Sequence, residues 1–166
     1  MMYTLKALGF SNCSVAFAAQ CAATLENYEI DTIQEKAHFF SQCYVEGNLS
    51  LIEAGYLSFE VAEEYRKQQY YYPYYGAGYL QLTWEKNYRS FSEHMGDPRI
   101  LSDGPQYVVQ NYAWTSAGWY WSSEGINDII ANGASVRQVT LAVNGGTSKL
   151  SEREERYKMY LAFFGG

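Results

Sequence analysis

The sequence predicts a mainly α-helical fold with a small β element, folded as a single domain over residues 1–166. Along most of the chain, apolar residues recur at the three- and four-residue spacing of a helix, and short Gly, Pro and Ser stretches separate these segments. Only the Tyr-rich segment after residue 69 lacks this periodicity, so we expect the only short strands there. The length suits one domain with a sizeable core, and no linker or repeat divides it.

Seven helices are expected. They cover residues 12–26, 32–46, 59–69, 84–95, 105–122, 135–143 and the C-terminal segment from 151. Their start signals are the N-cap residues Ser58, Thr83 and Ser135, a Pro in a first turn at Pro105, and a capping box of Ser151 and Glu154. Gly96 and Gly145 provide stop signals.

The composition excludes several classes of protein. A net charge of -6 argues against nucleic-acid binding, because neutralising phosphates needs clustered Lys and Arg. No apolar run is long enough to span a membrane, and polar residues interrupt the apolar stretch 15–25, so we expect no stable membrane insertion and no signal peptide. Cys13, Cys21 and Cys43 form no CxxC pair and are expected to be buried thiols.

Carboxylate chemistry is what remains after other catalytic classes are considered. The only histidines, His38 and His94, lie in no nucleophile motif such as G-x-S-x-G. They are also too few for a metal cluster, and the short G-A-G at 76–78 does not form a phosphate-binding loop. We therefore expect neither a metal nor a cofactor.

Glu46 is the first candidate acid. It ends the second predicted helix, directly after an apolar face that includes Phe39 and Cys43. A carboxyl against such a face is partly desolvated, which raises its pKa and suits a general acid. The alternative is a solvated glutamate at a helix end, and spacing alone favours this alternative.

Glu53 follows Glu46 by seven residues. A continuous helix would place the two on one face, about 10 Å apart along the axis. Gly47 and Asn48 are expected to end the helix, which leaves the separation open. An inverting glycosidase needs two carboxylates roughly 6.5–9.5 Å apart. The alternative role for Glu53 is a capping box with Ser50.

Three further carboxylates could serve the same chemistry. Glu60, Glu63 and Glu64 are alternatives to Glu53, but the neighbouring Arg66 and Lys67 indicate a solvated, charged helix face.

The Tyr-rich segment suggests a saccharide as the ligand. Six tyrosines (Tyr70, Tyr71, Tyr72, Tyr74, Tyr75 and Tyr79) surround one Pro and two Gly. Aromatic rings with polar edges on a stiff turn suit stacking against a sugar ring. Tyr70 to Tyr75 either line a groove or pack the loop against the core, and we expect Tyr75 and Tyr79 to bind the substrate.

Several motifs together resemble one family, in the right order and over most of the chain. Residues 37–42 (AHFFSQ) are similar to an A-x-F-L-A-Q helix, and 76–83 (GAGYLQLT) with Asn87 and Tyr88 to G-R-G-x-I-Q-L-[ST]…N-Y. Residues 97–98 (DP), 116–121 (SAGWYW) and Asn144–Gly146 with Arg153 are similar to N-P, S-A-x-W-F-W and N-G-G…D-R. The chain thus resembles the family 19 glycoside hydrolases, which are plant-type chitinases and shorter bacteriophage endolysins.

The resemblance implies a lysozyme-like fold and a role for each matched residue. Glu46 would be the general acid, Glu53 the general base, and Thr83 would help to place the attacking water. Gln81, Asn87, Asn144 and Arg153 would line the sugar groove, and Arg153 would also hold the base ionised.

The chain departs from the family pattern at two positions. Val45 stands where the family usually has His, and Ala77 stands where it has the Arg of G-R-G. The segment between Glu46 and Tyr70 is also shorter than in plant chitinases, which should open one end of the cleft. These departures keep open a catalytically weak saccharide-binding or tail-associated structural domain as an alternative.

The expected function is that of a monomeric glycosidase that cleaves β-1,4 bonds in peptidoglycan with inversion, as an endolysin or lysozyme does. The alternative substrate is chitin. Such a protein would be made in the cytoplasm and act on the cell wall after release. Its partner would be the polysaccharide.

Overall fold

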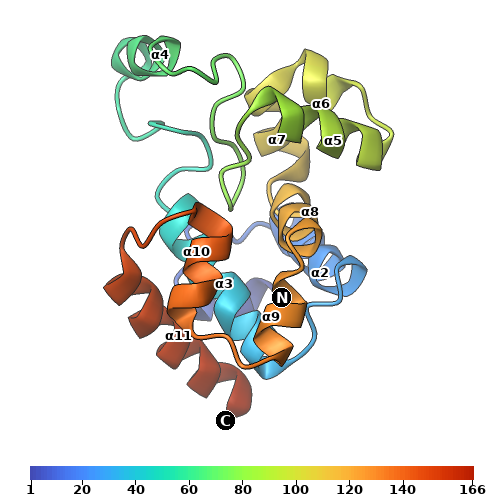
Figure 1. Cartoon of the computed structure of the whole chain (residues 1–166), viewed down its shortest axis with the longest axis vertical. Coiled ribbons are helices and arrows are strands. Elements are labelled where there is room, and N and C mark those ends of the chain that lie inside the picture. Colours follow the sequence, from blue (N-terminus) through green and yellow to red (C-terminus); the bar gives the residue numbers. More distant parts are fainter.

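The computed structural model describes all 166 residues and contains eleven helices (Figure 1). These are α1 (Met2–Ala7), α2 (Val15–Asn27), α3 (Ile33–Gly47), α4 (Phe59–Lys67), α5 (Glu85–Met95), α6 (Arg99–Ser102), α7 (Gly104–Tyr112), α8 (Thr115–Ser123), α9 (Ile126–Ala131), α10 (Val136–Asn144) and α11 (Leu150–Gly165). None of them is long and apolar enough to cross a membrane. The expected mainly α fold is confirmed.

Two hydrophobic clusters hold these helices together. In the larger cluster, the ring of Tyr79 stacks on Trp114 with 3.6 Å between centroids, and Phe39 of α3 packs edge-on against Trp121 of α8. The smaller cluster joins α5, α6 and α7 through residues such as Phe91. Figure 1 shows these three helices at one end of the molecule, while α3, α10 and α11 lie at the other end.

The small β element lies between these two groups of helices. It consists of two isolated antiparallel bridges, Ile52 with Ala77 and Ala77 with Leu82. In Figure 1 the segment between α4 and α5 descends to the end of α3. Ala77 is fully buried in the smaller cluster and pairs with both partners, so the position where the family has Arg is part of the packing here.

The helix ends confirm some predicted caps and correct others. Ser135 forms a capping box, with Gln138 as its partner. The N-cap of α5 is Trp84 and not Thr83, because the helix begins at Glu85, and the Thr83 hydroxyl donates to Gln81 O at 2.6 Å. The capping box predicted for Ser151 and Glu154 is wrong, since α11 already begins at Leu150. Ser58 occupies the N-cap of α4 without a side-chain bond to it.

The helix predicted over 105–122 is two helices. The Trp114 amide donates to Gln20 Oε1 of α2 at 2.6 Å, and Ala113 O accepts from the Tyr79 amide at 3.0 Å. Backbone groups committed to distant partners are unavailable for the helical ladder, and the helix is interrupted there. The short α1, α6 and α9 were also not predicted. Cys21 and Cys43 are buried as expected, whereas Cys13 is half-buried.

Candidate active site

Glu46 lies where the last turn of α3 meets the Tyr-rich segment. The next residue, Gly47, is buried, and a Cβ built on it would lie 2.6 Å from Tyr79 Cα. No side chain fits this gap without moving backbone. The close approach, which glycine alone permits, brings the end of α3 against the backbone of 76–83.

The carboxyl of Glu46 is held by two helices distant in sequence. Asn144 Nδ2, at the end of α10, donates to Glu46 Oε1 at 2.8 Å, and the Arg153 guanidinium of α11 forms an ion pair with the same oxygen. The second oxygen, Oε2, accepts no hydrogen bond from the protein. One oxygen is therefore fixed and the other is available to a ligand.

Arg153 is itself locked in place. Its side chain is 1% exposed, and its Nη1 donates to Gln42 Oε1 of α3, while its Nε donates to Ser148 O at 3.0 Å. Gln42 Nε2 in turn donates to Thr140 Oγ1 of α10 at 3.2 Å. Every guanidinium nitrogen thus has an acceptor, as a buried charge requires. The network joins α3, α10 and α11 beneath Glu46.

Glu53 is held by different groups. Its Oε1 accepts from the Tyr71 hydroxyl at 2.6 Å and its Oε2 from the Gly76 amide at 2.9 Å. Arg66 Nε donates to the Glu53 backbone carbonyl at 2.8 Å. Glu53 opens no helix, and Ser50 bonds to Ile52, so the predicted capping box between Ser50 and Glu53 is absent.

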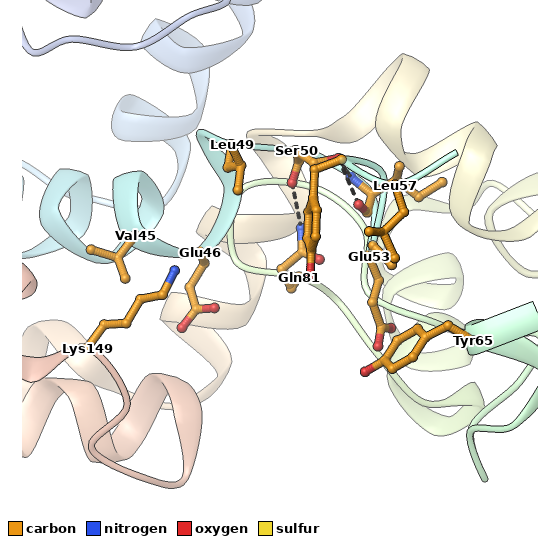
Figure 2. A pocket seen from close by; sticks show the side chains of 12 residues that line it. Val45, Glu46, Leu49, Ser50, Glu53, Leu57, Tyr65, Gln81 and Lys149 are labelled. Atoms are coloured by element: carbon orange, nitrogen blue, oxygen red, sulfur yellow. Dashed lines mark hydrogen bonds between the residues drawn. The ribbon is translucent and has the colours of Figure 1, made fainter. Parts of the chain in front are cut away.

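Two hollows adjoin at Glu46 and Gln81, which line both. The first hollow, of about 300 Å³, contains Glu46 and Glu53 together. Its other lining residues are Val45, Leu49, Ser50, Ile52, Ala54, Tyr56, Leu57, Tyr65, Gln81 and Lys149. Figure 2 shows the two carboxylates on either side of Gln81, with Lys149 on the side of Glu46 and Tyr65 on the side of Glu53.

The second hollow, of about 370 Å³, lies on the other side of Glu46 and Gln81. It is lined by Glu46, Leu80, Gln81, Leu82, Thr83, Trp84, Asn87, Tyr120, Val143, Asn144 and Gly145. Thr83 and Glu53 therefore line different hollows. Because Glu46 and Gln81 belong to both, the two hollows form one groove with Glu46 at its middle.

Three of the four residues predicted to line the sugar groove lie together, and the fourth, Arg153, does not. Gln81, Asn87 and Asn144 line the second hollow. Arg153 is buried under the groove and does not line it. The prediction that Arg153 holds the base Glu53 ionised is wrong, because the carboxylate paired with Arg153 is that of Glu46.

The prediction that Tyr75 and Tyr79 bind substrate is wrong. Tyr79 is 1% exposed and stacks on Trp114 in the core. Tyr75 is also buried, and the guanidinium of Arg66 lies 4.7 Å from its ring centroid. Burial of an aromatic ring is favourable, and neither ring lines the groove around Glu46.

The other carboxylates considered for catalysis lie outside the first hollow. Glu60 and Glu64 line a separate surface hollow, and Glu63 accepts from the Tyr72 hydroxyl at 3.0 Å. The face of α4 is charged, as predicted. However, Arg66 is buried, contrary to the expected solvated position.

Four residues that line the groove are not predicted from the sequence. Trp84, which is 49% exposed, and Tyr120 line the second hollow, whereas Tyr65 and Lys149 line the first. Trp84 directly follows Thr83 in the matched motif, and this adjacency could have identified it. The other three have no local signal.

No protein-family model matches the sequence. Several solved structures are similar to this chain. Chitinase C from Streptomyces griseus HUT6037 has 21% identity and a TM-score of 0.68, with 89% of this chain and 83% of that chain covered. A bacterial family 19 chitinase has 22% identity and a TM-score of 0.69, with 89% of this chain and 85% of that chain covered. The class IV chitinase of the same family from Zea mays has 20% identity and a TM-score of 0.69, with 99% of this chain and 90% of that chain covered.

This chain has the fold of the family 19 chitinases. The fold that the motifs implied is therefore confirmed. The likeness extends over nearly the whole chain, so the groove around Glu46 belongs to the shared domain and not to an added segment.

Proposed function

We propose that the protein is a glycoside hydrolase that cleaves β-1,4 bonds between N-acetylhexosamine units. The observation that carries this proposal is the placement of Glu46 and Glu53 in one hollow, each held by donors from other parts of the chain. A pair of carboxylates flanking a groove is the arrangement that hydrolysis of a glycosidic bond uses. The family 19 fold supports the same reaction.

Glu46 acts as the general acid in this proposal. Its Oε2, free of protein donors, gives a proton to the glycosidic oxygen as the bond from that oxygen to C1 breaks. The proton transfer leaves Glu46 as a carboxylate beside Arg153. The buried guanidinium then stabilises the negative charge that develops there.

Glu53 acts as the general base. A water held between Glu53 and the sugar gives a proton to the Glu53 carboxylate while its oxygen forms the new bond to C1 on the opposite face. The anomeric configuration is thereby inverted. Thr83 lines the second hollow, and its predicted part in holding this water stays a prediction.

Peptidoglycan is the substrate we favour. Leu49, Ile52 and Leu57 give the first hollow apolar lining, and Lys149 lines the same hollow. Peptidoglycan carries a lactyl group and a peptide with alanine and free carboxylates, which suit a hollow lined by apolar side chains and one cation. We further propose that the protein acts as an endolysin on the bacterial wall, after release from the cytoplasm.

Chitin is the second candidate, because the similar solved structures are those of chitinases. Chitin presents only hydroxyls and acetamido groups. It has no anionic group for Lys149 to bind.

The test compares wild type, Glu46→Gln and Glu53→Gln on purified peptidoglycan and on chitin oligomers, with reducing ends as the readout. Both variants should lose at least about 100-fold in kcat, since each removes a proton-transfer group. Glu60→Gln, outside the groove, is the matched control and should keep wild-type rates. Proton NMR of the first product should show the inverted anomer.

The outcomes separate the candidates. Release from chitin alone would remove the endolysin proposal. No release from either polymer, together with binding to one of them, would leave a saccharide-binding domain. Full activity in Glu46→Gln would show that another group is the acid.

A further inference from the structure

The orientation of the Glu53 carboxylate depends on one side chain. Glu53 lies outside every helix, so no helical turn fixes its direction. Its two oxygens each accept one hydrogen bond, from Tyr71 Oη and from the Gly76 amide. The amide is part of the backbone at the β bridge, so the Tyr71 hydroxyl is the only side-chain donor.

The Tyr71 ring is itself held in place. It packs edge-on against Trp84, with 5.2 Å between centroids, and the Trp84 amide donates to Tyr74 O at 2.9 Å. Trp84 lines the second hollow. Tyr71 thus connects the carboxylate in the first hollow to an aromatic wall of the second.

The phenol of Tyr71 remains a donor over the whole working pH range. Burial and the hydrogen bond to Glu53 raise its pKa well above the ordinary value of a tyrosine. The short contact therefore joins a neutral hydroxyl to a carboxylate, which is the stronger, charge-assisted kind of hydrogen bond.

Two nearby tyrosines donate to acceptors outside the groove. The Tyr72 hydroxyl donates to Glu63 of α4 at the surface, and the hydroxyl of Tyr88, in α5, donates to Tyr75 O in the interior. Tyr71 differs from them because its acceptor is a carboxylate that faces the groove.

We infer that Tyr71 is a positioning residue for the reaction: its hydroxyl aims the Glu53 carboxylate at the attacking water. This inference rests on the proposed role of Glu53 as the general base. Without the hydroxyl, Oε1 loses its donor and the carboxylate rotates about the bond to Gly76. A base out of line with its water slows the chemical step, whereas the sugar contacts of the groove are unaffected.

The test uses Tyr71→Phe, with Tyr72→Phe as the matched control. Both variants remove one hydroxyl from the same loop, and phenylalanine keeps the ring that packs on Trp84. Tyr71→Phe should lower kcat about 10- to 100-fold with KM within about twofold of wild type. Tyr72→Phe should leave both constants unchanged.

A double-mutant cycle shows whether Tyr71 acts through Glu53. In the Glu53→Gln background, Tyr71→Phe should cause no further loss, because the group that it positions is already inactive. Thermal unfolding of the two Phe variants should agree within a few degrees.

Three results would overturn the inference: equal kcat in the two Phe variants, a full additional loss in the Glu53→Gln background, or unfolding of Tyr71→Phe at the assay temperature. Failure of the proposed function looks different. If the proposed function is wrong, the wild type releases no reducing ends, or Glu53→Gln keeps the wild-type rate. In either case the inference about Tyr71 is also wrong.

Discussion

Asn144 and Glu46, 98 residues apart, meet where α10 and α3 end: Nδ2 of Asn144 donates to Oε1 of Glu46 at 2.8 Å. Both residues also line the second hollow. This hydrogen bond fixes Oε1 of the Glu46 carboxyl and leaves Oε2 available to a ligand in the groove.

Asn144→Ala should lower kcat about 10- to 150-fold, because a lost hydrogen bond to a charged group costs about 1.5–3 kcal/mol in orientation and charge stabilisation. Steady-state kinetics measures this. Asn132→Ala, which removes an amide bonded only to Asp128 O within α9 and its cap, is the control. Equal effects of the two substitutions would contradict the role of Asn144.

Arg153→Met should destabilise the protein by about 3–5 kcal/mol, because it removes the cation that pairs with the partly buried Glu46 carboxylate and leaves the buried Gln42 amide oxygen without its donor. Urea unfolding measures the loss. Arg89→Met breaks an exposed ion pair with Glu85 and should change the stability by at most about 1 kcal/mol. A small effect at Arg153 would show that the network under Glu46 does not stabilise the fold.

Gly47→Ala should cost about 1–3 kcal/mol and lower kcat, because the new Cβ would lie 2.6 Å from Tyr79 Cα and push α3 away from the groove floor. The thermal midpoint and kcat are measured together. Gly165→Ala, at the end of α11, places its Cβ at 3.9 Å from Ile33 Cγ2, the nearest atom outside its own helix, and serves as control. Wild-type behaviour of Gly47→Ala would mean that this close approach is not needed.

His38 should make stability depend on pH. Burial lowers its pKa to about 4, and its Nδ1 has no hydrogen-bond partner while the ring stacks on Tyr157. The unfolded chain therefore binds a proton below about pH 6.5 that the folded protein does not. Stability is complete above this pH and falls as the pH drops toward 4, by on the order of 3 kcal/mol.

The pH dependence can be assigned by substitution. His38→Phe should lose less stability than wild type between pH 7 and pH 4.5 in urea unfolding. The same change at the exposed His94 is the control. Parallel pH profiles for wild type and His38→Phe would contradict the assignment to His38.

Local patterns in the sequence were enough for most of the fold. Apolar spacing predicted α2, α3, α4, α5 and α10 close to their observed bounds, and Gly96 and Gly145 end their helices in the left-handed conformation, as expected. These features depend on residues within about one turn of each other. Ordered motifs also pointed to the fold, and they singled out the two carboxylates that the structure places in one hollow.

The sequence by itself determined the mainly helical fold and the choice of Glu46 and Glu53 as the candidate pair. Only the tertiary structure decided their partners: Arg153 for Glu46, Tyr71 for Glu53, and the core for Tyr79. It also decided the break before Trp114, where Gln20 captures the backbone amide. The reason is range: spacing and caps act within a few residues, whereas these contacts join groups 18 to 107 residues apart and are selected by packing.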